Sequence, residues 1–181
     1  MTLKAGNPDA RAVWPLLLTA LLCFTALPAL ALPEDREQPI YIESDRAERD
    51  GRQGITTYEG DVRLRQGSLR IEAERITVHT DENDEVQRVL AEGSPAHFEQ
   101  QPEADGPPVS AEAYRIHYQI DQQMLELTTS ALLEQGDASM RGNRIDYDIA
   151  KELVKAEGDA ETDSPRIRMV LPPKNERPEQ D

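Results

Sequence analysis

The chain has 181 residues, of which 20 are basic and 35 acidic, so its formal net charge is −15. A surface this acidic repels nucleic acid and anionic membranes at long range, and we expect neither as a partner. Aromatic residues make up only 4 % of the chain. The interior must therefore consist mainly of Ile, Leu, Val and Ala, which suits a thin sheet structure better than a thick globular core.

The first 31 residues predict an export signal. Lys4 and Arg11 form a basic start, an apolar run follows, and small residues at 29 and 31 are typical of a cleavage site. We expect cleavage after Ala31. The alternatives are an uncleaved membrane anchor and a lipoprotein acylated on Cys23, which Leu22 disfavours because a small residue is wanted there.

Removal of this segment changes the balance of the chain. It contains Lys4, Arg11 and Asp9, so the mature chain keeps 18 basic and 34 acidic residues and a net charge of −16. It also contains the only cysteine. The exported domain is therefore expected to hold its sheet together without a disulfide.

Alternating apolar and charged residues from Ile55 to Val78 predict a β-meander with one apolar face. Val62 and Leu64 alternate with arginines, and a second alternating run starts at Leu69. Where the alternation breaks, Gly60-Asp61 and Gly67-Ser68 supply turn residues. We expect the chain to reverse at both places.

The other elements follow from the same reasoning. In chain order they are a polar lead-in over Leu32–Gln38, an edge strand over Pro39–Ser44, a turn at Asp50-Gly51, a polar turn over Thr80–Glu85, strands over Val86–Leu90 and Ala96–Gln100, a loop over Gln101–Pro108, a strand over Tyr114–Ile120, and a hairpin of Met124–Leu127 with Ala131–Gln135. Residues 145–157 are predicted to be strand, with helix as the alternative, because both periods fit. Pro165–Leu171 is a candidate last strand, and 172–181 is predicted to be a disordered acidic tail.

Parts of the chain repeat one another. Residues 135–147 align with 66–78 without a gap, and the element Arg-Ile-x-(Val/Tyr) starts at Arg75, Arg115 and Arg144. Self-similarity at a spacing of a few tens of residues indicates stacked supersecondary units. We therefore predict one all-β domain over 32–171, built from repeated antiparallel meanders.

No catalytic motif is found in the sequence, and the three histidines are far apart. Asp81-x-Asn83-x-Glu85, followed by Glu92, resembles the ligand pattern of a calcium loop, but Val86 stands where that loop needs glycine. A polar turn is the better interpretation. We expect no enzymatic activity, no cofactor and no metal ion.

Several segments together resemble the periplasmic lipopolysaccharide transport protein A (LptA) family. They are the leader, Gln38–Asp45, Tyr58–Val62, Gln66-Gly67 and Ser94–Phe98, and the resemblance extends to about Leu171. It implies a periplasmic β-jelly roll of about sixteen antiparallel strands whose hydrophobic interior carries the lipid A portion of lipopolysaccharide from the inner to the outer membrane. It also implies head-to-tail assembly with itself and with the jelly-roll domains of the inner-membrane and outer-membrane export components.

The resemblance and the alternation together suggest lipid contacts. Positions that the family turns toward lipid are Ile40, Ile42, Phe98, Tyr118 and Ile120, and the alternation adds Val62, Leu64, Ile116, Leu125 and Leu127. For any single one of these residues, ordinary core packing is the alternative. Two other functions stay open, namely a related jelly-roll subunit of the same export pathway and a structural envelope protein without lipid cargo.

Overall fold

The computed structural model describes residues 35–102, 106–158 and 166–173, and nearly all regular structure in them is antiparallel β-strand. The elements are η1 (Asp35–Glu37), β1 (Tyr41–Glu43), β2 (Arg46–Asp50), β3 (Ile55–Gln66), β4 (Leu69–Thr80), β5 (Val86–Gln100), β6 (Val109–Gln119), β7 (Met124–Gln135), β8 (Ala138–Asp148), β9 (Leu153–Glu157) and β10 (Arg168–Val170). The predicted leader and acidic tail lie outside the described residues, apart from 172 and 173.

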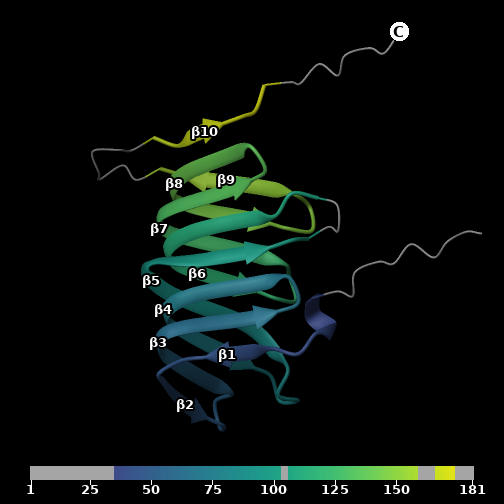
Figure 1. Ribbon diagram of the computed structural model, residues 1–181, viewed down its shortest axis with the longest axis vertical. Coiled ribbons are helices and arrows are strands. Elements are labelled where there is room, and N and C mark those ends of the chain that lie inside the picture. The colour runs from purple at the N-terminus through teal and green to yellow at the C-terminus, as the bar shows by residue number, and fades with distance from the viewer. Residues whose placement is uncertain (1–34, 103–105, 159–165, 174–181) are drawn as a thin grey trace, which may run out of the picture. The chain divides into compact units, whose positions relative to one another are not determined.

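The strands form one sheet in the order β1-β3-β4-β5-β6-β7-β8-β10, with β2 also pairing with β3 and β9 with β8. Figure 1 shows β3 to β8 stacked one after another, as expected for a meander in which each strand pairs with the next. The predicted edge position of the first strand is confirmed. Residues 145–157 are strand, as predicted, but a turn over 149–152 divides them between β8 and β9.

Every long strand is bent near its middle. The register between neighbours shifts after Glu59 in β3, Glu72 in β4, Glu92 in β5, Glu112 in β6 and Thr128 in β7. An extra residue at such a bulge bends the strand and can turn the following side chains to the other face. In β4, for example, the buried positions are Leu69 and Ile71 before the bulge but Ile76 and Val78 after it.

The aligned bulges form a crease that divides the sheet into two half-sheets. Half-sheet A contains β1, 62–66, 69–73, 96–100, 109–113, 131–135, 138–142 and β10, and half-sheet B contains β2, 55–59, 75–80, 86–92, 115–119, 124–128, 144–148 and β9. Each of six long strands therefore supplies two halves, and four short strands supply one each. The described residues form ten strands rather than about sixteen, because the two halves of each long strand are continuous.

Three predicted breaks are corrected by these bends. The chain does not reverse at Gly60-Asp61, which is a bulge inside β3. Likewise 86–90 and 96–100 are two halves of β5, and 124–127 and 131–135 are two halves of β7 rather than a hairpin. Gly60 with φ +85° and Thr129 with φ +68° adopt the left-handed conformation at two of these bends. By contrast, Gly67-Ser68 is a true turn, as predicted.

Candidate functional site

The candidate site is the apolar interior between the two half-sheets. Val62, Leu64, Phe98, Ile116, Tyr118, Ile120, Leu125 and Leu127 are all buried, and Ile40 and Ile42 are partly buried against them. The ten residues singled out in the sequence therefore meet in one continuous core. They come from both half-sheets, because the parity switch at each bulge keeps apolar side chains on the inner face before and after the bend.

One aromatic contact shows that the half-sheets face each other. Phe98 lies in half-sheet A and Tyr118 in half-sheet B, and their ring centroids are 5.4 Å apart in an edge-to-face arrangement. Val89, the neighbour of Tyr118 in the sheet, is nine residues from Phe98 along β5. That separation would span roughly 30 Å in a straight strand. The contact is possible only because β5 folds back at the crease.

The interior is packed rather than open at these positions. Phe98 is 1 % exposed and Tyr118 3 %, and burial raises the pKa of the Tyr118 hydroxyl. The same core contains residues that the sequence reasoning did not select. They are Leu69, Ile71, Ile76, Val89, Leu133, Ile145 and Tyr147 among others. Their alternation is the same signal, so it could have identified them, but nothing in the pattern distinguishes a lipid contact from core packing.

Opposite the crease, the strand ends form two rims. Rim A consists of the described turn and loop residues 67–68, 101–102, 106–108 and 136–137, and rim B of those at 51–54, 81–85, 120–123 and 149–152. Between them lies a cleft of about 400 Å³. Its walls include Pro102, Pro107 and Gln135 on one side and Gln123, Ile149 and Lys151 on the other. The two rims thus face each other near the β7–β9 end.

Near β3 and β4, rim A carries a segment we call the strap, residues 35–38. Figure 1 shows its helical turn η1 beside the strand ends at one margin of the sheet. The Asp35 carboxylate accepts hydrogen bonds from the Ser68 amide at 2.6 Å, the Ser68 hydroxyl at 2.7 Å and Gln100 Nε2 at 2.8 Å. Gly67 has a φ of +58°, which glycine adopts easily in a turn. It also allows Asp35 to approach, because a Cβ atom at position 67 would clash with the Asp35 side chain.

Two glutamines on the inner face donate hydrogen bonds to the strap. Gln66 is 7 % exposed and donates to the carbonyl oxygens of Arg36, at 3.3 Å, and Gln38, at 3.0 Å. Gln100 is 9 % exposed, and its Oε1 atom is buried without a hydrogen-bond partner among the described residues. Buried amides without partners are rare, because their desolvation is not compensated.

The outer side of the crease carries opposite charges in register. Arg75 bonds Glu59 at 2.6 Å, and Arg115 bonds Glu92 at 2.9 Å. Hydrogen bonding to Arg75 and its positive charge lower the pKa of Glu59. All three Arg-Ile-x-(Val/Tyr) repeats begin with an arginine that pairs with a glutamate of the neighbouring strand in half-sheet B, since Arg144 also pairs with Glu126 at 2.6 Å. These exposed pairs belong to the outer surface and contribute little each to stability.

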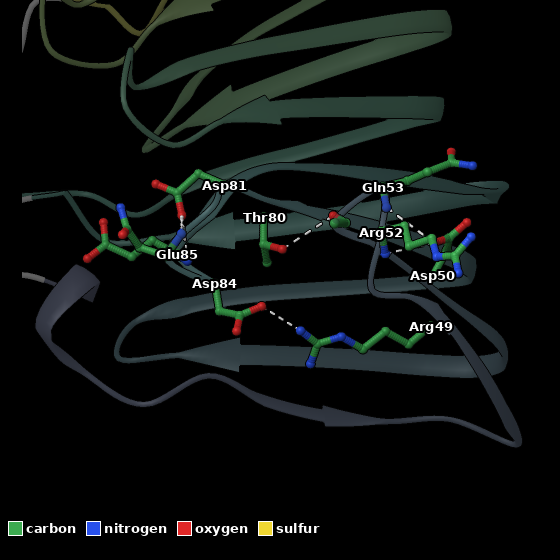
Figure 2. A network of polar contacts seen from close by, with 10 residues as sticks. Arg49, Asp50, Arg52, Gln53, Thr80, Asp81, Asp84 and Glu85 are labelled. Carbon is green, nitrogen blue, oxygen red and sulfur yellow. Dashed lines mark hydrogen bonds and ion pairs between the residues drawn. The ribbon is translucent and has the colours of Figure 1, made fainter.

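The polar turn predicted at 80–85 is confirmed. Figure 2 shows the Asp81 carboxylate directed at the turn, where it accepts hydrogen bonds from the backbone N–H groups of Asn83 at 2.8 Å and Glu85 at 2.9 Å. These bonds lower the pKa of Asp81, the one with Glu85 most. Asp84 of the same turn pairs with Arg49 of β2. The carboxylates therefore act as turn-forming groups that link neighbouring rim elements.

The histidines lie on the outer face of the sheet, as the sequence suggested. His97 lies 3.5 Å from Glu112, and His117 lies 3.9 Å from Glu126. Burial, followed by the charges of Arg88 and His117, lowers the pKa of His79. Among residues 35–102, 106–158 and 166–173, no helix is long and apolar enough to cross a membrane.

A sheet folded along a crease over a continuous apolar interior defines the class of antiparallel β-jelly rolls. Residues 41–153 match the sequence family described as LptA/(LptD N-terminal domain) LPS transport protein. The chain belongs to this family.

Individual relatives agree with this assignment. The lipopolysaccharide export system protein LptH of Pseudomonas aeruginosa is 36 % identical over 88 % of this chain and 94 % of its own length. LptA of Escherichia coli K12 is 31 % identical over 87 % and 84 % of the two chains. A crystal structure of P. aeruginosa LptH, titled the LptA-homologous periplasmic component of the lipopolysaccharide transport device, has a TM-score of 0.70 at 34 % identity and covers 78 % of this chain and all of that one.

Proposed function

We propose that this chain is a periplasmic carrier of lipopolysaccharide that shields the acyl chains between its two half-sheets during transport from the inner to the outer membrane. The observation that carries the proposal is the continuous apolar interior, which contains residues of β3 to β8 and is flanked by Ile42 of β1 and by Ile40 just before that strand. Relatives over most of the chain are named lipopolysaccharide export system proteins, which supports the same cargo.

The lipid contacts proposed are the ten interior residues identified in the sequence. Because they pack against one another in this structure, acyl chains must part the half-sheets and replace side-chain contacts with lipid contacts. Each buried methylene gains about 0.8 kcal/mol relative to water, whether it belongs to a side chain or to a lipid. Exchange of one apolar contact for another is therefore nearly neutral, which permits hand-over instead of irreversible capture.

The proposed carrier is not an enzyme. The sequence has no nucleotide-binding motif, so the work of moving lipid must come from a partner. Purified mature protein incubated with lipopolysaccharide-containing membrane vesicles tests the carrier proposal. We expect lipopolysaccharide to leave the vesicles with the protein, and failure to extract it at any protein concentration would instead favour a structural envelope protein.

We further propose head-to-tail assembly with itself and with the jelly-roll domains of the membrane export components. In the described residues, β1 and β2 pair only with β3, and β9 and β10 only with β8, so each end of the sheet presents an edge able to bond another strand. The two edges differ. Strand β2 is exposed and mostly charged. Strand β10 is exposed but presents apolar side chains, since Met169 is 56 % exposed and Val170 58 %.

Unlike edges form heterologous contacts, which propagate into filaments instead of closing as a dimer. Sedimentation over a wide concentration range should therefore detect oligomers of increasing size, and deletion of Pro165–Asp181 should shorten them. A strict monomer at every concentration, or a closed dimer indifferent to the deletion, would exclude end-to-end self-assembly.

A further inference from the structure

The last inner-face position of each long strand that runs toward rim A is a glutamine. Strand β3 ends at Gln66, β5 at Gln100 and β7 at Gln135. The two inner residues that precede each glutamine are apolar and buried. They are Val62 and Leu64 in β3, Ala96 and Phe98 in β5, and Ala131 and Leu133 in β7. We call the three amides the glutamine row.

The row follows the mouth of the apolar interior. Gln100 and Gln135 are both register partners of Val109, so they lie on either side of one strand, roughly 10 Å apart. The row therefore stands at the boundary between the packed side chains and rim A. An amide there can both donate and accept hydrogen bonds without adding charge.

The strap occupies part of this row. Gln66 donates to two strap carbonyl oxygens, and Gln100 Nε2 donates to the Asp35 carboxylate. In each case a strap oxygen accepts a hydrogen bond from the Nε2 atom of a glutamine on the inner face. Gln100 Oε1 is buried and has no hydrogen-bond partner among the described residues, although the Gln100 amide also lies close enough to the Tyr118 hydroxyl to act on its pKa. At the other end of the row, Gln135 lines the cleft of about 400 Å³.

We propose that the glutamine row binds the polar ends of acyl chains, meaning the ester or amide carbonyl oxygens and hydroxyl groups where the chains join the head of the lipid. This inference rests on the proposed carrier function and deepens it, because it states where the boundary between head and tail lies. Carbonyl oxygens suit the glutamine Nε2 donors, and a hydroxyl or amide N–H suits the free Oε1 of Gln100.

The neutrality of the row fits the charge of the protein. A formal net charge of −15 disfavours anionic groups at long range, whereas an amide row donates and accepts hydrogen bonds at short range without adding charge of its own. The strap is a stand-in for the ligand at Gln66 and Gln100, because its oxygens satisfy the donors that a lipid would use. Lipid must displace the strap to reach these two amides, but can reach Gln135 directly through the cleft.

The test compares two single-chain amphiphiles with the same head group and chain length, one joined by an ester and the other by an ether, which has no carbonyl oxygen. Their affinities for the full mature chain are measured by competition with a fluorescent acyl probe. We expect the ester to bind about twofold to tenfold more tightly, the range for one net neutral hydrogen bond.

Substitution shows whether the ester preference depends on the glutamine row or on a glutamine elsewhere on the surface. Gln135→Leu should abolish the ester preference, because this side chain lines the cleft and makes no hydrogen bond within the described structure that its loss would break. Gln119→Leu is the matched control, since Gln119 alternates with the inward Tyr118 and Ile120 and so lies on the outer face of β6. It should keep the preference.

Asp35→Ala tests the strap. Loss of its carboxylate frees Ser68 and Gln100, so the ester should bind more tightly than to the unsubstituted protein, and Gln100→Leu added to Asp35→Ala should remove that gain. Unchanged or weaker binding by Asp35→Ala would overturn the strap as a competitor.

Three further outcomes would overturn the glutamine row. Equal binding of ester and ether, or a preference that survives Gln135→Leu or disappears in Gln119→Leu, would overturn the glutamine row and leave the carrier function standing. Binding of neither amphiphile would overturn the carrier function and the row together.

Discussion

Replacement of Phe98 by alanine measures how tightly the interior is packed. Phe98 is 1 % exposed and makes the edge-to-face contact with Tyr118 across the half-sheets. Truncation of a buried phenylalanine costs about 3–5 kcal/mol, because apolar contact is lost and a cavity remains. An aromatic pair adds about 0.5–1.5 kcal/mol beyond its buried area. We therefore expect the free energy of unfolding to fall by about 4 kcal/mol.

Urea denaturation followed by circular dichroism is the assay. With a slope of about 2 kcal/mol per molar urea, the midpoint should fall by about 2 M. Typical domains have only about 5–15 kcal/mol of stability, so Phe98→Ala could leave the protein too unstable to measure. Phe98→Leu keeps more of the side-chain volume and should give a smaller loss that can still be measured. Arg65→Ala, on the exposed face of β3, is the control and should change stability by less than about 0.5 kcal/mol.

A loss below about 1 kcal/mol for Phe98→Ala would refute this reasoning. It would mean that Phe98 faces a hydrated groove in the free protein rather than a packed core. The energetic argument for near-neutral lipid exchange would then fail, because lipid entry would bury new apolar surface instead of replacing existing contacts.

Two further predictions concern protonation. Hydrogen bonding to Arg75 lowers the pKa of Glu59 from its ordinary 4.5, so Arg75→Gln should raise it in a carboxyl NMR titration. In the unsubstituted protein, the contribution of ionised Glu59 to stability is present above about pH 4.5 and is lost as the pH falls through the lowered pKa of the folded state. Burial lowers the pKa of His79 from 6.5, so its imidazole NMR signals should titrate below that value. Because the unfolded chain binds this proton more readily, the His79 contribution is present above pH 6.5 and is lost as pH falls through the lowered value.

The alternation of residues predicts the inner face correctly because it reflects side-chain direction along each strand. Val62, Leu64 and Ile116 are buried where the pattern places them, and Arg63 and Arg65 are exposed. The pattern is local and belongs to the backbone, so no long-range information is needed to interpret it. The same regularity predicts antiparallel meanders with one apolar face, whereas the jelly-roll class is implied by the resemblance to the LptA family.

The interruptions of that pattern are ambiguous in the sequence alone. Gly60-Asp61 and Thr129-Ser130 provide the left-handed conformations that turns use, yet the chain bends there and continues. A turn and a bulge need the same local chemistry. They differ in whether the next segment pairs with the preceding one or extends the same strand, and that choice depends on neighbouring strands. The change of parity in β4, from Ile71 to Ile76, is the signal that distinguishes a bend.

The strap could not be predicted from its own sequence. Asp35 belongs to a short polar segment without periodicity, and its partners Ser68 and Gln100 are 33 and 65 residues away along the chain. Only the folding of the sheet along the crease and the turn at Gly67 bring them together. The candidate lipid contacts share this limit, because the sequence identifies apolar positions but not whether lipid replaces their neighbours.

Site-specific photo-crosslinking tests the central claim most directly, namely that acyl chains occupy the space between the half-sheets. A photoreactive residue is placed at Phe98 or Tyr118 inside, or at Arg63 on the outer face of β3, and the protein is irradiated during lipopolysaccharide transport. The account predicts adducts with lipopolysaccharide at both interior positions and none at Arg63. Equal labelling at all three positions, or labelling at Arg63 alone, would contradict it.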